Sequence, residues 1–290
     1  INYRYGYEEL LYLFDNASAK GVIYDVQFSE YINNLIDKIP TLEVCISVGN
    51  KMGLSYKEFR YHDLLKYDND FEDYFRSEND YILQYTGGTT GLPKGVMWPH
   101  KNFFFACLGG GGIYAGLPPI SMPDEQGKIA SDASPMKILP CAPLMHGAAM
   151  WTALSGILGG MTIVLDPMKN GFNANKTWDK VEHEGVNIMQ IVGDAMAIPL
   201  LNSLKSKTKK WDLSNLVHLG SGGAVFSRHI KAEFKKILPK CTIADGMGTS
   251  ETGISGMGSM SLQEGIMQLP LTENQQVIID DRIAGINEIG

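Results

Sequence analysis

Cysteine is scarce in this sequence of 290 residues. Its four cysteines, Cys45, Cys107, Cys141 and Cys241, are far apart, and none forms a Cys-x-x-Cys pair. This spacing favours neither a disulfide framework nor a zinc site. We therefore expect reduced thiols and a cytoplasmic protein.

Long apolar runs and an excess of positive charge are also lacking. No run of about 18 apolar residues is present, so we expect no transmembrane segment. The 25 Lys and Arg residues are outnumbered by 32 Asp and Glu, which gives a net charge of −7. That balance provides no general attraction to nucleic acid, and we expect no nucleic-acid partner.

Glycine, in contrast, is abundant. The 32 glycines make up about 11% of the chain, against a usual ~7%, and they gather in a few clusters rather than in a repeat. Clustered glycines exclude collagen-like and linker-like sequences. They indicate binding sites that are built from backbone groups.

Short apolar segments alternate with amphipathic segments of helical length, which predicts an α/β fold with mainly parallel sheets. Glycine clusters follow the strands predicted at 81–85, 216–219 and 242–244. Ligands of α/β sheets bind at the carboxyl ends of strands, so we expect the three clusters at equivalent positions. Residues 117–135 hold four prolines and are predicted to form a loop.

The first cluster reads TGGTTGLPKG over residues 86–95. Its glycines allow backbone N–H groups to converge on an anion, its threonines add hydroxyl donors, and Lys94 adds a positive charge. This composition predicts a phosphate-binding loop. It is not a Walker loop, because the G-x-x-x-x-G-K-[ST] spacing is absent.

This motif resembles the signature phosphate loop of the adenylate-forming superfamily, which includes acyl-CoA synthetases, peptide-synthetase adenylation domains and luciferases. Two later stretches resemble family motifs in the same order. SGGA at 221–224 resembles the segment that lines the adenine, and MGTSETG at 247–253 resembles the aromatic-Gly-x-Thr-Glu motif. Met247 departs from the family, which usually has an aromatic residue there.

The resemblance implies a role for each matching position. It places four residues in catalysis: Thr86, Lys94, Ser250 and Glu251. It makes Glu251 the Mg²⁺ ligand. The residues implied to bind ATP are Thr86, Gly87, Gly88, Thr89, Thr90, Lys94, Gly222, Gly223, Ala224, Gly246, Met247, Gly248 and Ser250.

A fourth match is PLMHG at 143–147, where the family often has an aromatic residue or a histidine near the entering carboxylate. By resemblance, His146, Trp151 and Gly193 are expected to bind the acid. Ordinary structural roles are the alternative for each of them. Asp194 is expected to cap the helix that it opens.

The family's large N-terminal domain has stacked αβαβα layers, and residues 1–290 resemble its central part, incomplete at both ends. The resemblance implies that the small C-terminal domain, with its catalytic lysine, is not in this chain. We therefore expect the chain alone to be nearly inactive in full turnover.

The implied function is ATP-dependent activation of a carboxylic acid, either a fatty acid or a sterol side-chain acid, to an acyl-adenylate and then to a CoA thioester. ATP, Mg²⁺ and CoA are the implied cofactor and co-substrates, and homodimer formation is left open. Two alternatives remain. One is an adenylating relative with another acceptor, such as a carrier protein, and the other is a non-catalytic nucleotide-binding module.

Overall fold

The computed structural model describes residues 1–50, 58–67, 75–87, 91–111, 118–122, 124–166, 171–206, 209–259, 276, 278–279 and 281–283. The chain divides into two compact units, Ile1–His100 and Lys101–Gly290. In the described part of the chain, no helix is both long and apolar enough to span a membrane.

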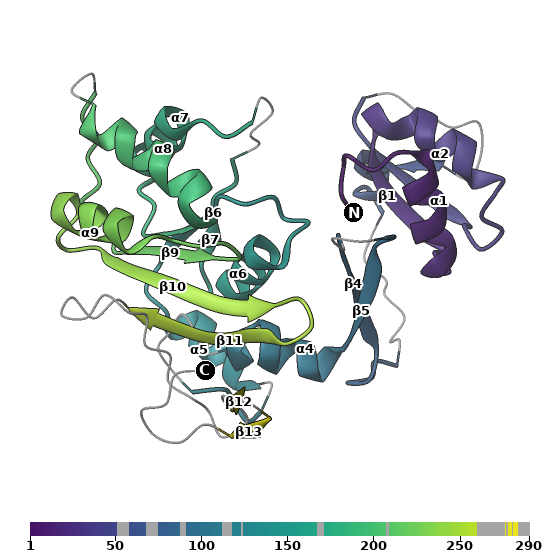
Figure 1. The fold of residues 1–290 in the computed structure, drawn as a ribbon. Coiled ribbons are helices and arrows are strands. Elements are labelled where there is room, and N and C mark those ends of the chain that lie inside the picture. Colours follow the sequence, from purple (N-terminus) through teal and green to yellow (C-terminus); the bar gives the residue numbers. More distant parts are fainter. Residues whose placement is uncertain are drawn as a thin grey trace. The chain divides into compact units, whose positions relative to one another are not determined.

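The first unit is built on a parallel sheet of β1 (Gly21–Asp25), β2 (Val44–Val48) and β3 (Glu58–Arg60). Helices α1 (Tyr7–Asn16) and α2 (Ser29–Ile36) place their apolar stripes on one face of it (Figure 1). The unit also contains the short elements η1 (Val26–Phe28) and α3 (Tyr61–Leu64). Alternating burial in β1 and β2 matches a sheet with one covered face.

A separate two-stranded hairpin ends the first unit. Its strands β4 (Tyr81–Thr86) and β5 (Lys94–Pro99) pair antiparallel, with Thr86 opposite Lys94. The first glycine cluster therefore follows a strand of an antiparallel pair and not of a parallel sheet, and the expected equivalence with the other two clusters is wrong. Strands so close in sequence pair antiparallel, because a parallel connection needs a dozen or more residues.

The second unit holds a six-stranded sheet in the order β11-β10-β9-β8-β6-β7. The pairs among β10, β9, β8, β6 and β7 are all parallel, and only β11 is antiparallel. The strands are β6 (Lys137–Pro140), β7 (Thr162–Ile163), β8 (Ile188–Ile191), β9 (His218–Gly222), β10 (Thr242–Thr249) and β11 (Gly253–Ser259). The predicted α/β class with mainly parallel sheets is confirmed.

Helices cover both faces of this sheet. On one face lie α7 (Ala174–Glu184), α8 (Gly193–Lys205) and α9 (Arg228–Ile237) (Figure 1). Trp178, Leu200 and Phe234 are fully buried there against Met189 and Leu219 of the strands. Helix α6 (Gly147–Leu158) packs on β6 and β7, and Gly156 lets it approach Ile138 closely. This packing holds the strand ends that form the site.

Smaller elements complete the unit: α4 (His100–Cys107), η2 (Gly109–Gly111), α5 (Asp124–Asp132), β12 (Ile278–Ile279) and β13 (Arg282–Ile283). Helix α5 contradicts the loop predicted over 117–135. The four prolines lie outside the helix, at 118, 119, 123 and 135. Asp124 and Glu125 favour its first turn, and Gln126 Nε2 donates to the Leu158 carbonyl at 2.5 Å.

All four cysteines are buried and free, as their spacing predicted. Burial raises the pKa of the Cys241 thiol to about 11 and that of Cys107 to about 12, and it raises the pKa of Cys141 as well. Thiolates are therefore disfavoured, and none of these three is poised as a nucleophile.

Candidate active site

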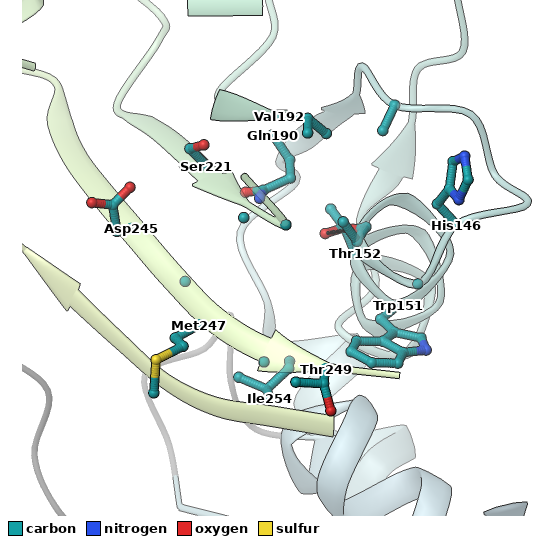
Figure 2. Close-up of a pocket in the computed structure, with 18 of the residues that line it drawn as sticks. His146, Trp151, Thr152, Gln190, Val192, Ser221, Asp245, Met247, Thr249 and Ile254 are labelled. Atoms are coloured by element: carbon teal, nitrogen blue, oxygen red, sulfur yellow. Dashed lines mark hydrogen bonds between the residues drawn. The ribbon is translucent and has the colours of Figure 1, made fainter. Parts of the chain in front are cut away.

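A cavity of about 670 Å³ opens in the second unit where β8, β9 and β10 end beside the start of α6 (Figure 2). Its wall is formed by Ala142, Pro143, His146, Gly147, Ala148, Trp151, Thr152, Ser155, Gln190, Val192, Ala195, Met196, Gly220, Ser221, Gly222, Gly223, Ala244, Asp245, Gly246, Met247, Gly248, Thr249, Ser250 and Ile254. Parallel strands place ligand sites at this edge. The cavity brings together eight of the predicted site residues: His146, Trp151, Gly222, Gly223, Gly246, Met247, Gly248 and Ser250.

One wall is backbone, supplied by paired glycines at the ends of two strands. Gly222 of β9 lies opposite Gly246 of β10, and Met247 follows, half exposed. The glycine cluster expected to follow the strand at 242–244 instead lies within that strand, because β10 continues to Thr249 by pairing with β11. At the bulge between Met247 and Gly248, a Cβ on Gly248 would overlap the Gly253 carbonyl. Glycine is therefore required at position 248, because the backbone of β11 approaches it too closely for a side chain.

Behind this wall, Ser221 ties β9 to the start of α8. Ser221 is almost fully buried, and its Oγ accepts a hydrogen bond from the Gly193 N–H at 2.9 Å. Gly193 has φ of +52° and closely abuts Ala224 and the Val225 carbonyl, so a side chain would be strained there. Gly193 is buried and Ala224 is exposed, and neither is among the residues that form the cavity wall.

Asp194 fastens the loop that follows β9. Its carboxylate accepts hydrogen bonds from the Ser227 N–H at 2.8 Å and from the Ser227 hydroxyl. Ser227 is the N-cap residue of α9, whereas α8 has no side-chain cap bond of its own. The expectation that Asp194 caps its own helix is wrong. Its role is to join α8 to the start of α9.

Asp245 forms a buried ion pair that was not predicted from the sequence. Its carboxylate binds the ammonium group of Lys231, a residue of α9, and the side chains are only 15% and 7% exposed. The Lys231 Nζ also lies 5.7 Å from the centroid of the Phe226 ring. Lys231 follows Ile230 on the buried face of α9, where an apolar residue is usual. A lysine at such a position is the sequence feature that could have indicated a buried ion pair.

Helix α6 and β8 supply a largely apolar wall. Trp151 is 7% exposed and faces the cavity, and Thr152 donates its hydroxyl to the Ala148 carbonyl at 2.7 Å (Figure 2). His146 precedes α6 and is exposed at the cavity, without a side-chain cap bond. Gln190, which was not predicted as a site residue from the sequence, points into the cavity from β8 (Figure 2). It looks like an ordinary strand residue in the sequence.

The turn between β10 and β11 holds the predicted metal ligand. Thr249 Oγ1 accepts hydrogen bonds from the backbone N–H groups of Glu251 at 3.2 Å and Thr252 at 3.1 Å. This arrangement leaves the Glu251 carboxylate exposed next to Ser250, which lines the cavity. Among the described residues, no group of three or more His, Cys, Asp or Glu could hold a metal. One carboxylate fits Mg²⁺, which usually takes one or two carboxylates together with substrate phosphates.

The remaining predicted residues belong to the first unit. Thr86 and Lys94 are cross-strand neighbours at the end of the β4–β5 hairpin, and the Thr86 hydroxyl donates to the Lys94 carbonyl at 3.5 Å. Gly87 and Lys94 are exposed. Gly88, Thr89 and Thr90 lie outside the described residues. The hairpin thus joins a hydroxyl and a cation that are eight positions apart in the sequence.

Comparison with solved structures defines the fold class. The O-succinylbenzoate coenzyme A synthetase of Bacillus subtilis, in complex with AMP, aligns with a TM-score of 0.69 at 18% identity. The alignment covers 99% of this chain and 52% of that chain. The fold is therefore that of adenylate-forming N-terminal domains.

The AMP-binding enzyme family matches residues 1–285, and the chain belongs to this family. A Mycolicibacterium smegmatis protein, named medium/long-chain-fatty-acid–CoA/3-oxocholest-4-en-26-oate–CoA ligase, is 34% identical over 97% of this chain and 52% of its own length. A 3-oxocholest-4-en-26-oate–CoA ligase of Rhodococcus rhodochrous is 33% identical over 89% of this chain and 47% of its own. The chain thus spans about half the length of these relatives.

Proposed function

We propose that this chain supplies the adenylate-forming site of an AMP-forming acid–CoA ligase. The observation that carries the proposal is the composition of the cavity, which joins a glycine-built backbone wall on β9 and β10 to an apolar wall on α6 and β8. The first suits a nucleotide, and the second suits the hydrocarbon part of an acid. Membership of the AMP-binding family supports this division.

In the proposed first step, a carboxylate oxygen of the acid attacks the α-phosphorus of ATP, and the bond to pyrophosphate breaks. The acid is already ionised at neutral pH, so no protein base is needed. The requirement is to stabilise negative charge on the phosphoryl group, which hydroxyls and a cation can do. We assign this role to Thr86, Lys94 and Ser250, together with Thr89 and Thr90.

Glu251 is proposed to hold Mg²⁺, which would neutralise phosphate charge when bound. Gly222, Gly223, Gly246, Met247 and Gly248 would line the nucleotide with backbone groups and a thioether. Gly87, Gly88 and Ala224 belong to the same proposed ATP-binding set.

In the proposed second step, the CoA thiol attacks the activated carbonyl and AMP leaves. His146 and Trp151 would contact the acid directly, and Gly193 would support that wall from behind. The relatives' named substrates, medium- and long-chain fatty acids and 3-oxocholest-4-en-26-oate, indicate a large apolar acid. A reducing compartment such as the cytoplasm fits the four free cysteines.

The test is ATP–pyrophosphate exchange by the natural gene product that carries this chain, with a panel of aliphatic and ring-bearing acids. We expect exchange that depends on both acid and Mg²⁺. Glu251→Ala should lower it, whereas the same change at Glu184 on α7 should leave it unchanged. Absence of exchange with every acid would contradict the proposal.

A further inference from the structure

The polar side chains around the cavity fall into two groups. Thr152, Ser155, Ser221 and Asp245 are each bonded within the protein, as are Thr249 and Ser250. In the part of the chain that the structure describes, only His146 and Gln190 face the cavity with a polar side chain that has no partner. His146 is exposed at its margin, whereas Gln190 is partly buried in its wall.

The glycines of β9 make room for the Gln190 carboxamide. Gln190 pairs with Gly220 across the β8–β9 ladder. A Cβ added at Gly220 would overlap Gln190 Oε1, and one added at Gly222 would lie 3.4 Å from Gln190 Nε2. The carboxamide thus lies against the bare backbone of β9, with its end directed into the cavity (Figure 2).

The cavity into which Gln190 points has many apolar side chains in its wall. Apolar side chains of the cavity wall include Ala142, Ala148, Trp151, Val192, Ala195, Met196 and Ile254. A saturated hydrocarbon laid over this wall would remove water from the Gln190 carboxamide and offer no hydrogen bond in return, which is unfavourable. A ligand oxygen at the same place would restore the bond, because a carboxamide both donates and accepts.

We propose that Gln190 is a specificity-determining residue of the acid pocket. It selects acids whose carbon skeleton carries a hydroxyl or oxo group over unsubstituted acids of the same size. The inference rests on the proposed function and names the substrate class within it. A site that bonds a substrate oxygen discriminates against the analogue that lacks it, because its own polar group is then left unpaired.

The test is calorimetric binding of acyl-sulfamoyl adenosines to the natural gene product that carries this chain. The ligands are a saturated acyl chain, the same chain with an oxo or hydroxyl group at successive carbons, and adenosine sulfamate without an acyl group. At least one oxygenated ligand should bind about tenfold more tightly than the saturated ligand, a ratio typical of one hydrogen bond. The position of the favoured oxygen follows from the series.

Gln190→Leu and Gln190→Met should each abolish that preference, by weakening the oxygenated ligand and tightening the saturated one. Gly220→Ala should act in the same direction, since its methyl group would displace the carboxamide. The matched control is Met196→Leu, a change of similar volume on the same wall. It should keep the preference, and binding of adenosine sulfamate should be unchanged in both Gln190 variants and in Met196→Leu.

Three results would overturn the inference. The wild-type protein could bind all acyl ligands equally, the preference could persist in both Gln190 variants, or these variants could weaken adenosine sulfamate as much as its acyl derivatives. The last result would assign Gln190 to the nucleotide. If adenosine sulfamate and every acyl ligand fail to bind the wild-type protein, the proposed function itself fails.

Discussion

The two glycine-rich regions of this chain differ in what holds them in place. The glycines of β9 and β10 lie in a six-stranded sheet, next to Leu219 and Ile243, which are packed in the core under α8 and α9. The β4–β5 hairpin is a two-stranded sheet, and Leu83 and Met97 on it are 42% and 60% exposed. One region is fixed by packing in the core of a six-stranded sheet. The other is fixed mainly by pairing of two strands, of whose side chains only Gln84 and Trp98 are buried.

This difference suggests two roles: the packed strands β9 and β10 suit recognition of a ligand of fixed shape, and the exposed Lys94 supplies a mobile positive charge. A wall held by a core presents its backbone groups in one arrangement, which suits the fixed outline of a base and an acid. An exposed lysine at a hairpin end keeps its rotamer freedom, which suits phosphates that change position during reaction. Substitutions in the first region should therefore affect stability and binding together, and those at exposed positions of the second, such as Lys94, should affect activity alone.

The largest expected effect comes from the buried ion pair. Lys231→Met keeps the apolar stem and leaves the Asp245 carboxylate without its cation, so we expect a loss of about 3–5 kcal/mol in the free energy of unfolding. Urea denaturation measures it. The double variant Lys231→Met/Asp245→Asn should recover part of that loss.

The control for this prediction is an exposed pair. Lys209→Met removes the charged partner of Asp179 and leaves its hydrogen bond from Trp211 Nε1; the Lys209 and Asp179 side chains are 49% and 48% exposed. It should cost only about 0–1 kcal/mol. Equal losses at the two sites would contradict the claim that the buried Lys231–Asp245 pair stabilises the fold more than an exposed pair does.

A substitution in the hairpin should act on the reaction instead. We expect Lys94→Ala to lower pyrophosphate exchange by about 10²–10³-fold, because one charged donor to the phosphoryl group is lost. Its unfolding midpoint should stay at the wild-type value, since Lys94 is exposed. A large loss of stability would contradict this prediction, because it would show that Lys94 supports the fold as well as the reaction.

Asp194 offers a smaller test of the wall that packing supports. Asp194→Ala removes both hydrogen bonds to Ser227 and should cost about 1–2 kcal/mol. It should also weaken adenosine sulfamate, because the loop after β9 loses its fastening. Asn173→Ala is the matched control: it removes the N-cap bond to the Lys176 N–H of α7, at 3.0 Å, and should lower stability alone.

The smallest expected effect is a pH dependence at His218. Burial lowers the pKa of His218 below its ordinary 6.5, so the folded state binds fewer protons than the unfolded state. Its contribution to stability is therefore complete above pH 6.5 and is lost as pH falls toward the folded pKa. His218→Gln should reduce the change in unfolding free energy between pH 7.5 and 5.5. An unchanged slope would contradict this assignment.

The sequence predicts the fold class well, because periodicity and strand–helix alternation reflect local burial. It fails where distant pairing decides. The glycine cluster at 246–248 is expected to follow a strand, but β11 supplies the ladder partners that make it part of that strand. The prolines around α5 suggest a loop over the whole segment, although they only flank a helix.

The same distinction applies to the site. Resemblance to family motifs identifies Ser250, Glu251 and Lys94 as candidates, because each motif is a short continuous stretch of the sequence. Gln190 and Lys231 have no such signature. Their importance comes from contacts across strands and helices, with Gly220 in one case and Asp245 in the other. Only tertiary structure brings these groups together.

The central claim is that the cavity at the ends of β9 and β10 holds an acyl-adenylate. Amide hydrogen exchange, measured with and without a saturating acyl-sulfamoyl adenosine, tests it most directly. We predict slower exchange in peptides covering residues 218–227 and 244–255, and no change in peptides from α7. Unchanged exchange at both strand ends under saturating ligand would contradict the account.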